Sequence, residues 1–189
     1  MDEKLVIAVI EGSARDKRES IKAARFVADI GQSLPGVEII FVDPKDFNFP
    51  NDGNDTEGKD SKYGAITARA DAFFIVTPEY NHSFPGSLKR MLDSEYENYW
   101  RKPVALAGVS NGGWGGTRAV ENLLPSLRTM GLLPIQFTTY FPRVQDIFDE
   151  NGVIHEDKKE RYTKSITSEF EELIWIARCI KWGRTNLPG

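Results

Sequence analysis

Residues 77–89 read TPEYNHSFPGSLK and directly follow an apolar run at residues 72–76. An apolar run that ends in polar residues and prolines, and then changes to helical spacing, predicts a strand, a tight loop and a helix. In an open α/β sheet, the loops at the carboxyl ends of the strands line the ligand crevice. We therefore interpret this segment as a binding loop at the carboxyl edge of a sheet.

Two further loops follow predicted strands in the same way. Residues 12–20 follow the apolar run 5–10, and residues 110–116 follow the apolar run 103–109. Continuous runs of apolar and β-branched residues are typical of parallel strands that are covered on both faces. Because parallel strands end at the same edge of a sheet, we expect all three loops to meet there.

Strands and helices alternate along the whole chain, which predicts an α/β fold with a parallel sheet and right-handed crossovers. Two more strands are expected at residues 37–42 and 133–139. The expected helices lie at 21–34, 63–70, 84–94, 117–130 and 158–182. A length of 189 residues is typical of one domain, so we expect a single domain over residues 1–189.

Composition excludes several classes of function. The formal net charge of −4 gives no global reason to expect a nucleic-acid partner, and no apolar run approaches the length of a membrane span. Cys179 is the only cysteine, so an internal disulfide or a metal site built from cysteines is not expected. The amino terminus has no cationic segment that leads into a long apolar stretch, and we expect a cytoplasmic protein.

The loop after the first strand combines hydroxyl groups and cations at the start of a helix: Ser13, Arg15, Arg18 and Ser20. Unpaired N–H groups and the positive end of the helix dipole make such a position suitable for a phosphate group. A solvated helix cap with surface arginines is the alternative interpretation. The glycine fingerprints of triphosphate and dinucleotide sites are both absent, which favours the phosphate of a mononucleotide.

The other two loops could border a planar ring. Four glycines between residues 112 and 116 leave the main chain open to a flat group, although they could equally serve only to shape a turn. In the central loop, Tyr80 offers an aromatic surface and Asn81 offers an amide to a polar ring edge. Together the two loops favour a ring-binding site.

Three motifs together resemble the NADPH-dependent FMN reductase family of flavodoxin-like proteins, which includes quinone, azo-dye and chromate reductases. The motifs are GSxRxxR from residue 12, TPEYNxSxPGxLK from residue 77 and SxGGxGG from residue 110. The similarity extends over about residues 5–133 and more weakly into the closing helix.

The resemblance implies a flavodoxin-like three-layer sandwich with a five-stranded parallel sheet in the order 2-1-3-4-5. It also implies non-covalently bound FMN, NADPH or NADH as co-substrate, and a homodimer, sometimes a dimer of dimers. Matched by motif, the phosphate would be held by Ser13, Arg15, Arg18 and Ser20. The flavin ring would be bordered by Pro78, Glu79, Tyr80, Asn81, Ser110, Gly112 and Gly113.

The implied activity is that of an FMN-dependent oxidoreductase. Electrons would pass from NAD(P)H through FMN to quinones or similar acceptors, such as azo dyes, chromate or free flavin, in a ping-pong scheme. Because hydride transfer to flavin requires no carboxylate, we expect Glu79 to orient its loop and assign no catalytic side chain. His82 is the remaining candidate for a proton donor, and a solvated loop histidine is the alternative.

Two other functions are compatible with these loops. A flavodoxin-like electron carrier or redox sensor would hold FMN without turning over a pyridine nucleotide, and a regulatory protein could bind a mononucleotide without redox chemistry. Carriers usually have a phosphate loop rich in hydroxyl groups and glycine, so Arg15 and Arg18 argue against a carrier.

Two regions lie outside these motifs. The polar segment 43–62 departs from the family pattern, and we expect an ordered loop packed by Phe47 and Phe49, with a flexible excursion as the alternative. Large apolar residues on two helices predict the homodimer interface. These residues are Phe84, Leu88, Met91, Trp175 and Trp182.

Overall fold

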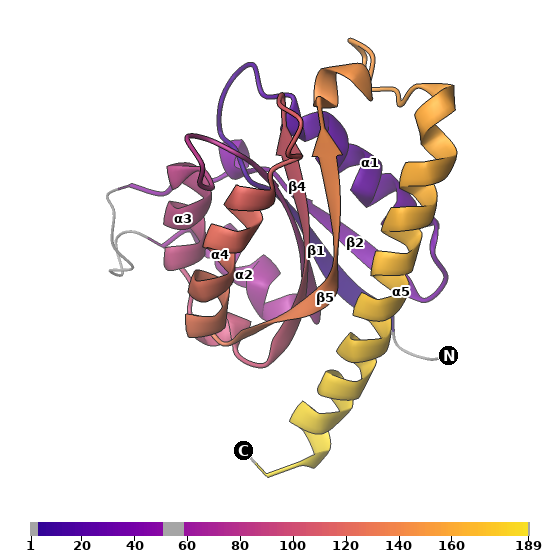
Figure 1. Cartoon of the computed structure of the whole chain (residues 1–189). Helices are drawn as coiled ribbons and strands as arrows, with labels where there is room; N and C mark the ends of the chain where they lie inside the picture. Colours follow the sequence, from indigo (N-terminus) through magenta and orange to yellow (C-terminus); the bar gives the residue numbers. More distant parts are fainter. Residues whose placement is uncertain (1–3, 51–58, 189) are drawn as a thin grey trace.

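The computed structural model of the chain describes residues 4–50 and 59–188. Its centre is a five-stranded parallel sheet in the order β2-β1-β3-β4-β5 (Figure 1). The strands are β1 (Leu5–Glu11), β2 (Val37–Val42), β3 (Ala72–Pro78), β4 (Lys102–Ser110) and β5 (Leu132–Pro142). This confirms the predicted strand order and the parallel direction.

Helices cover both faces of the sheet, which gives the three layers of the expected sandwich (Figure 1). Helices α1 (Ser20–Ser33) and α5 (Glu156–Asn186) lie on one face. Helices α2 (Ser61–Arg69), α3 (Gly86–Asp93) and α4 (Thr117–Thr129) lie on the other. Short 3₁₀ turns are η1 (Pro44–Asp46), η3 (Glu97–Tyr99) and η4 (Val144–Asp146). In the part of the chain that the structure describes, no helix is both long and apolar enough to span a membrane.

Helices cover the central strands on both faces, which explains why the strand sequences do not alternate between apolar and polar residues. In β1, Ile7 and Val9 pack with α1 and α5, whereas Ala8 and Ile10 pack with the helices of the opposite face. All four side chains are fully buried. A strand covered on both faces has no solvent-facing position, so residues 5–10 of β1 are all apolar.

The polar segment after β2 is partly ordered by aromatic packing. Phe47 and Phe49 make edge-to-face contacts with Tyr63 of α2, with ring centroids 5.6 and 5.5 Å apart. The Arg90 side chain of α3 donates a 2.5 Å hydrogen bond to the Pro50 carbonyl. The expected loop is therefore ordered at its beginning, and residues 51–58 lie outside the described residues.

One part of the interface prediction is wrong. Leu88 and Met91 are fully buried in the core beneath α3, and therefore cannot face a partner. Helical spacing shows that a helix has an apolar face, but it does not show whether the sheet or another subunit covers that face. Phe84 is partly buried against the same core. Trp175 and Trp182 of α5 are 65% and 61% exposed, so the homodimer stays a prediction that depends on Phe84 and these two residues.

A buried carboxyl group compensates for an irregularity between β4 and β5. The register of these strands shifts between Val104 and Leu106, where β5 bulges. Glu169 of α5 lies beneath the bulge, accepts a 2.7 Å hydrogen bond from the Thr139 hydroxyl group, and accepts backbone hydrogen bonds from Leu106 and Thr139. Burial raises the pKa of Glu169 to about 8.

We expect Glu169→Gln to change the pH dependence of stability. The folded state binds the Glu169 proton more tightly than the unfolded state, so its contribution to stability is present below about pH 4.5 and is lost as the pH rises to about 8. The variant should therefore gain stability relative to the wild type as the pH rises from about 5 to about 8, measured by urea unfolding. Glu171→Gln, on the exposed side of the same helix, should show no such trend. A difference between Glu169→Gln and wild type that is independent of pH would contradict the assignment.

Candidate active site

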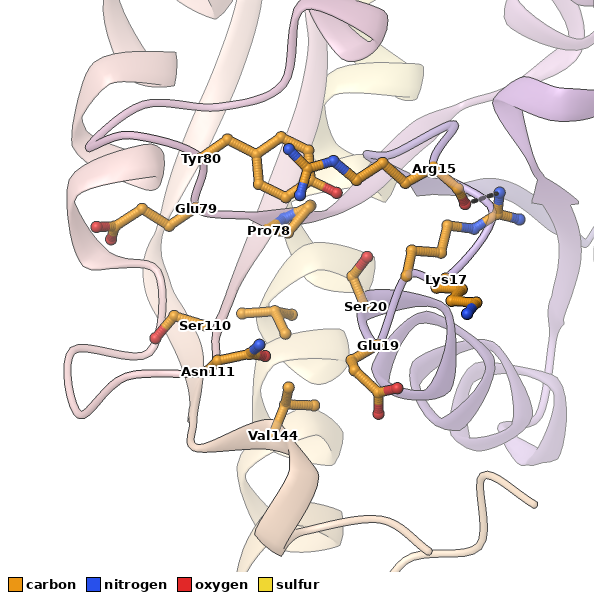
Figure 2. A pocket seen from close by; sticks show the side chains of 12 residues that line it. Arg15, Lys17, Glu19, Ser20, Pro78, Glu79, Tyr80, Ser110, Asn111 and Val144 are labelled. Atoms are coloured by element: carbon orange, nitrogen blue, oxygen red, sulfur yellow. Dashed lines mark hydrogen bonds between the residues drawn. The ribbon is translucent and has the colours of Figure 1, made fainter. Parts of the chain in front are cut away.

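The three loops predicted from the sequence meet at the carboxyl edge of the sheet and surround a cavity of about 190 Å³ (Figure 2). The first loop follows β1, the second follows β3 and the third follows β4. The cavity is lined by Arg15, Lys17, Arg18, Glu19, Ser20, Pro78, Glu79, Tyr80, Val109, Ser110, Asn111 and Val144.

Seven of the residues expected at the site line this cavity. They are Arg15, Arg18, Ser20, Pro78, Glu79, Tyr80 and Ser110. Ser13 is buried beneath the first loop, and Asn81, Gly112 and Gly113 lie on exposed loop surface outside the cavity lining. The structure therefore brings seven of the predicted residues together at the cavity. Ser13 lies beneath the cavity, and the other three lie outside its lining.

Several lining residues were not expected from the sequence. Lys17 lies between the two arginines of the first loop, and its charge would have been a signal for inclusion in the phosphate site. Val144 reaches the cavity from η4, beyond the end of β5, and no motif marks it. Only the arrangement of chain segments in space reveals such a residue. The others are Glu19, Val109 and Asn111.

Ser13 links the first two loops. Its hydroxyl oxygen lies 2.7 Å from the Tyr80 hydroxyl oxygen and accepts a 3.2 Å hydrogen bond from the Arg15 backbone N–H. The side chain is fully buried, so these contacts fix loop geometry below the cavity. Ser13 thus positions both Arg15 and Tyr80.

The two arginines of the first loop have different environments. Arg15 is exposed, and its guanidinium group lies 3.8 Å from the centroid of the Tyr80 ring, a cation–π contact across the cavity (Figure 2). The Arg18 side chain is only 8% exposed; it forms an ion pair with Asp43 and lies 3.9 Å from a Glu11 oxygen. Protein carboxylates therefore compensate much of the Arg18 charge, whereas Arg15 remains available to an anion.

The central loop contains a tight turn from Tyr80 to Ser83. Tyr80 and Ser83 exchange two backbone hydrogen bonds of 2.8 and 3.0 Å, and the two residues between them have left-handed backbone angles, with φ of 49° at Asn81 and 68° at His82. Two consecutive residues with positive φ are the pattern of a type I′ turn, in which asparagine is favoured. The Asn81 side chain is exposed at the corner of this turn.

Helix α4 holds the turn in place. The Nη1 atom of Arg118 lies 2.8 Å from Nε2 of His82, and the Asn122 side chain donates a 2.6 Å hydrogen bond to the His82 carbonyl group. Because a guanidinium group can only donate, Nε2 accepts and carries no proton in this geometry. His82 therefore has an anchoring role here and does not line the cavity.

Arg118 also forms a 2.5 Å ion pair with Glu79, whose side chain is only 7% exposed. The second carboxylate oxygen of Glu79 is buried without a hydrogen-bond partner in the described part of the chain. This pairing agrees with the expectation that Glu79 orients its loop. No sequence signal marked Arg118, because an arginine on a solvated helix is common.

The glycines of the third loop fall into two groups. A Cβ atom at Gly116 would lie 2.4 Å from the Val109 backbone nitrogen, and both Gly115 and Gly116 have positive φ, so these two glycines shape the turn. At Gly112 and Gly113, a Cβ atom would meet no described heavy atom within 4 Å beyond the chain neighbours. The second pair therefore leaves an open surface beside the cavity, suitable for a flat group.

A family model of NADPH-dependent FMN reductases matches residues 5–145. The chain belongs to this family. It is accordingly an FMN-dependent oxidoreductase that uses NAD(P)H, with a flavodoxin-like fold. No group of three or more His, Cys, Asp or Glu residues that could hold a metal ion occurs within residues 4–50 and 59–188.

Individual relatives agree with the family. A quinone reductase from Pseudomonas putida is 26% identical over 95% of this chain and 100% of its own length. An NAD(P)H-dependent FMN reductase of Schizosaccharomyces pombe is 35% identical over 62% of each chain. Among solved structures, the flavoenzyme NAD(P)H:(acceptor) oxidoreductase FerB from Paracoccus denitrificans is similar, with a TM-score of 0.73 and 21% sequence identity. The match covers 92% of this chain and 98% of the FerB chain, and it supports the fold.

The residues present fit FMN. The Arg15 and Lys17 side chains and the amino terminus of α1, where Glu19 makes no side-chain cap, suit a phosphate group. A volume of about 190 Å³ is below the roughly 300–1,000 Å³ of typical ligand pockets, so the cavity matches only part of the cofactor. The phosphate and its chain suit the cavity, and the ring suits the open glycine surface.

We expect Arg118→Ala to destabilise the protein by on the order of 1–3 kcal/mol, because it leaves the buried Glu79 carboxylate without its cation. Urea unfolding provides the measurement. Glu79→Gln combined with Arg118→Ala should recover part of the loss, because a neutral amide does not require a cation. Arg128→Ala, an exposed position on the same helix, should change stability by less than about 0.5 kcal/mol. Equal effects of Arg118→Ala and Arg128→Ala would show that the ion pair does not hold the loop.

Proposed function

We propose that this enzyme passes electrons from NAD(P)H through FMN to quinones or similar acceptors in a ping-pong scheme. The observation that carries the proposal is a cationic cavity that opens onto an uncovered glycine surface, at the edge where the three family motifs meet. Relatives named quinone reductase and NADPH azoreductase, the latter from Bacillus sp. and 28% identical over 88% of this chain, support acceptors of this class.

The protein groups divide into those that bind and those that position. Arg15, Lys17 and the amino terminus of α1 would hold the phosphate. The ion pair between Glu79 and Arg118 would fix the loop beside the ring. When bound, FMN supplies the chemistry that accepts hydride and passes electrons onward.

The shape of the site supports the proposed ping-pong order. Gly112 and Gly113 leave one open surface beside the cavity, and both the nicotinamide and the acceptor would have to lie against the same ring there. The pocket would therefore release the oxidised nucleotide before it admits an acceptor.

We further propose that residues 1–189 form one functional domain that works as a homodimer or a dimer of dimers in the cytoplasm. Exposed Trp175 and Trp182 on α5 provide apolar surface for a subunit contact. The free, exposed thiol of Cys179 is suited to a reducing compartment.

Anaerobic reduction of the FMN-loaded protein tests the proposal. Addition of NADPH or NADH should bleach the flavin absorbance, and subsequent addition of a quinone should restore it. Initial rates at several fixed quinone concentrations should give parallel double-reciprocal lines. A protein that binds FMN but is not bleached by either nucleotide would instead be an electron carrier or sensor, and intersecting lines would exclude the ping-pong order.

Gly112→Val should slow reduction of bound FMN by NADPH while leaving the fold and FMN affinity close to wild type. The added side chain has space within the protein, but it would enter the surface on which ring and nicotinamide align. Hydride transfer needs the reacting atoms within about 3–3.5 Å, so a small displacement lowers the rate strongly. Stopped-flow reduction of FMN-saturated protein measures the effect, with Gly112→Ala expected to lie between wild type and Gly112→Val. A wild-type rate in Gly112→Val would show that the ring does not use this surface.

A further inference from the structure

Glu11, the last residue of β1, lies directly behind the cationic cavity and is fully buried. One of its carboxyl oxygens accepts a 3.0 Å hydrogen bond from the Ser13 backbone N–H and a 2.7 Å hydrogen bond from the Ser20 hydroxyl group. The same oxygen lies 3.9 Å from Nε of Arg18. None of the binding and positioning roles described above uses this carboxyl group.

These contacts place the Glu11 carboxylate in competition with the phosphate group of a bound ligand. Ser13 and Ser20, which the family motif assigns to the phosphate, both donate to Glu11, and Ser20 and Arg18 also line the cavity. If Glu11 is ionised, it holds these donors itself and repels a phosphate dianion on their other side. If Glu11 is neutral, this repulsion is absent, while Arg18 keeps its ion pair with Asp43.

The surroundings of Glu11 determine which form prevails. Arg18 of the first loop is the cation that favours ionisation, and Asp43, at the end of β2, pairs with Arg18 and opposes it. The neighbouring strand β3 contributes Val76 and Thr77, which do not titrate. The second oxygen of Glu11 is buried without a hydrogen-bond partner in the part of the chain that the structure describes. Burial is the largest influence and raises the pKa of Glu11 to about 8.

We propose that Glu11 is a positioning residue that couples binding of the cofactor phosphate to protonation of its own carboxyl group. The neutral form places no negative charge behind the phosphate, whereas the ionised form repels it. Binding of the dianion above neutral pH therefore takes up one proton from solvent onto Glu11, and dissociation returns it. This inference rests on the proposed placement of the FMN phosphate in the cavity.

The pH dependence of FMN affinity tests the coupling. Apoprotein is titrated with FMN between pH 7 and pH 9, above the second phosphate pKa of about 6, so that the phosphate charge is nearly constant. The dissociation constant of the wild type should rise by up to about tenfold per pH unit above pH 8, which corresponds to one coupled proton. Glu11→Gln should remove this slope, because the side chain stays neutral.

Two controls separate the phosphate from the rest of the ligand and Glu11 from other acids. Riboflavin lacks the phosphate, so its dissociation constant should change little over this pH range. Asp29→Asn removes an exposed carboxylate from α1 and should keep the wild-type slope for FMN. Calorimetry of FMN binding to the wild type at pH 9, in two buffers of different ionisation enthalpy, should show an uptake that approaches one proton. This measurement does not depend on the folding of any variant.

The outcomes distinguish the inference from the function on which it rests. Equal slopes in wild type and Glu11→Gln, no proton uptake, or the same slope for riboflavin and FMN would overturn the role of Glu11 while leaving the oxidoreductase intact. Failure of the wild type to bind FMN at any pH would instead overturn the placement of the phosphate.

Discussion

The common direction of the five strands is the constraint on which the site depends. Parallel strands must be joined by crossovers, so every strand ends at the same edge, and the loops that follow β1, β3 and β4 converge there although they are far apart in the sequence. The backbone of each loop begins in a strand that is buried on both faces. A rigid core therefore fixes where the loops start, and only their short polar segments remain free to form a binding surface.

Ion pairs and hydrogen bonds between segments then set the shape of this surface. Arg118 of α4 pairs with Glu79 and contacts His82, which ties the central loop to the helix that follows the glycine loop. Ser13 and Tyr80 join the first loop to the central loop. Because each contact links two different segments around the cavity, displacement of one segment would disturb the others, and the cavity behaves as one structural unit.

Glu11 and Glu169 are both buried carboxyl groups with a raised pKa, but they lie in different surroundings. Burial raises the pKa of each to about 8. Glu169 satisfies backbone groups at the bulge in β5, where a neutral carboxyl group suits a permanently dry interior. Glu11 lies behind the proposed phosphate site, where the same shift in pKa would affect ligand binding as well as stability.

The sequence by itself determined the strand order, the layers and the three loops, because apolar runs and helical spacing reflect burial directly and the motif 77–89 is specific to one family. It also identified seven of the residues that line the cavity. The tertiary structure decided the rest. Charge alone could not distinguish Arg15, which faces the cavity, from Arg18, which pairs with Asp43 just after another strand. Nor could spacing show that Leu88 and Met91 belong to the core, or that Arg118 reaches Glu79. Each of these facts depends on which segments distant in the sequence pack together, and a local pattern of residue types does not contain that information.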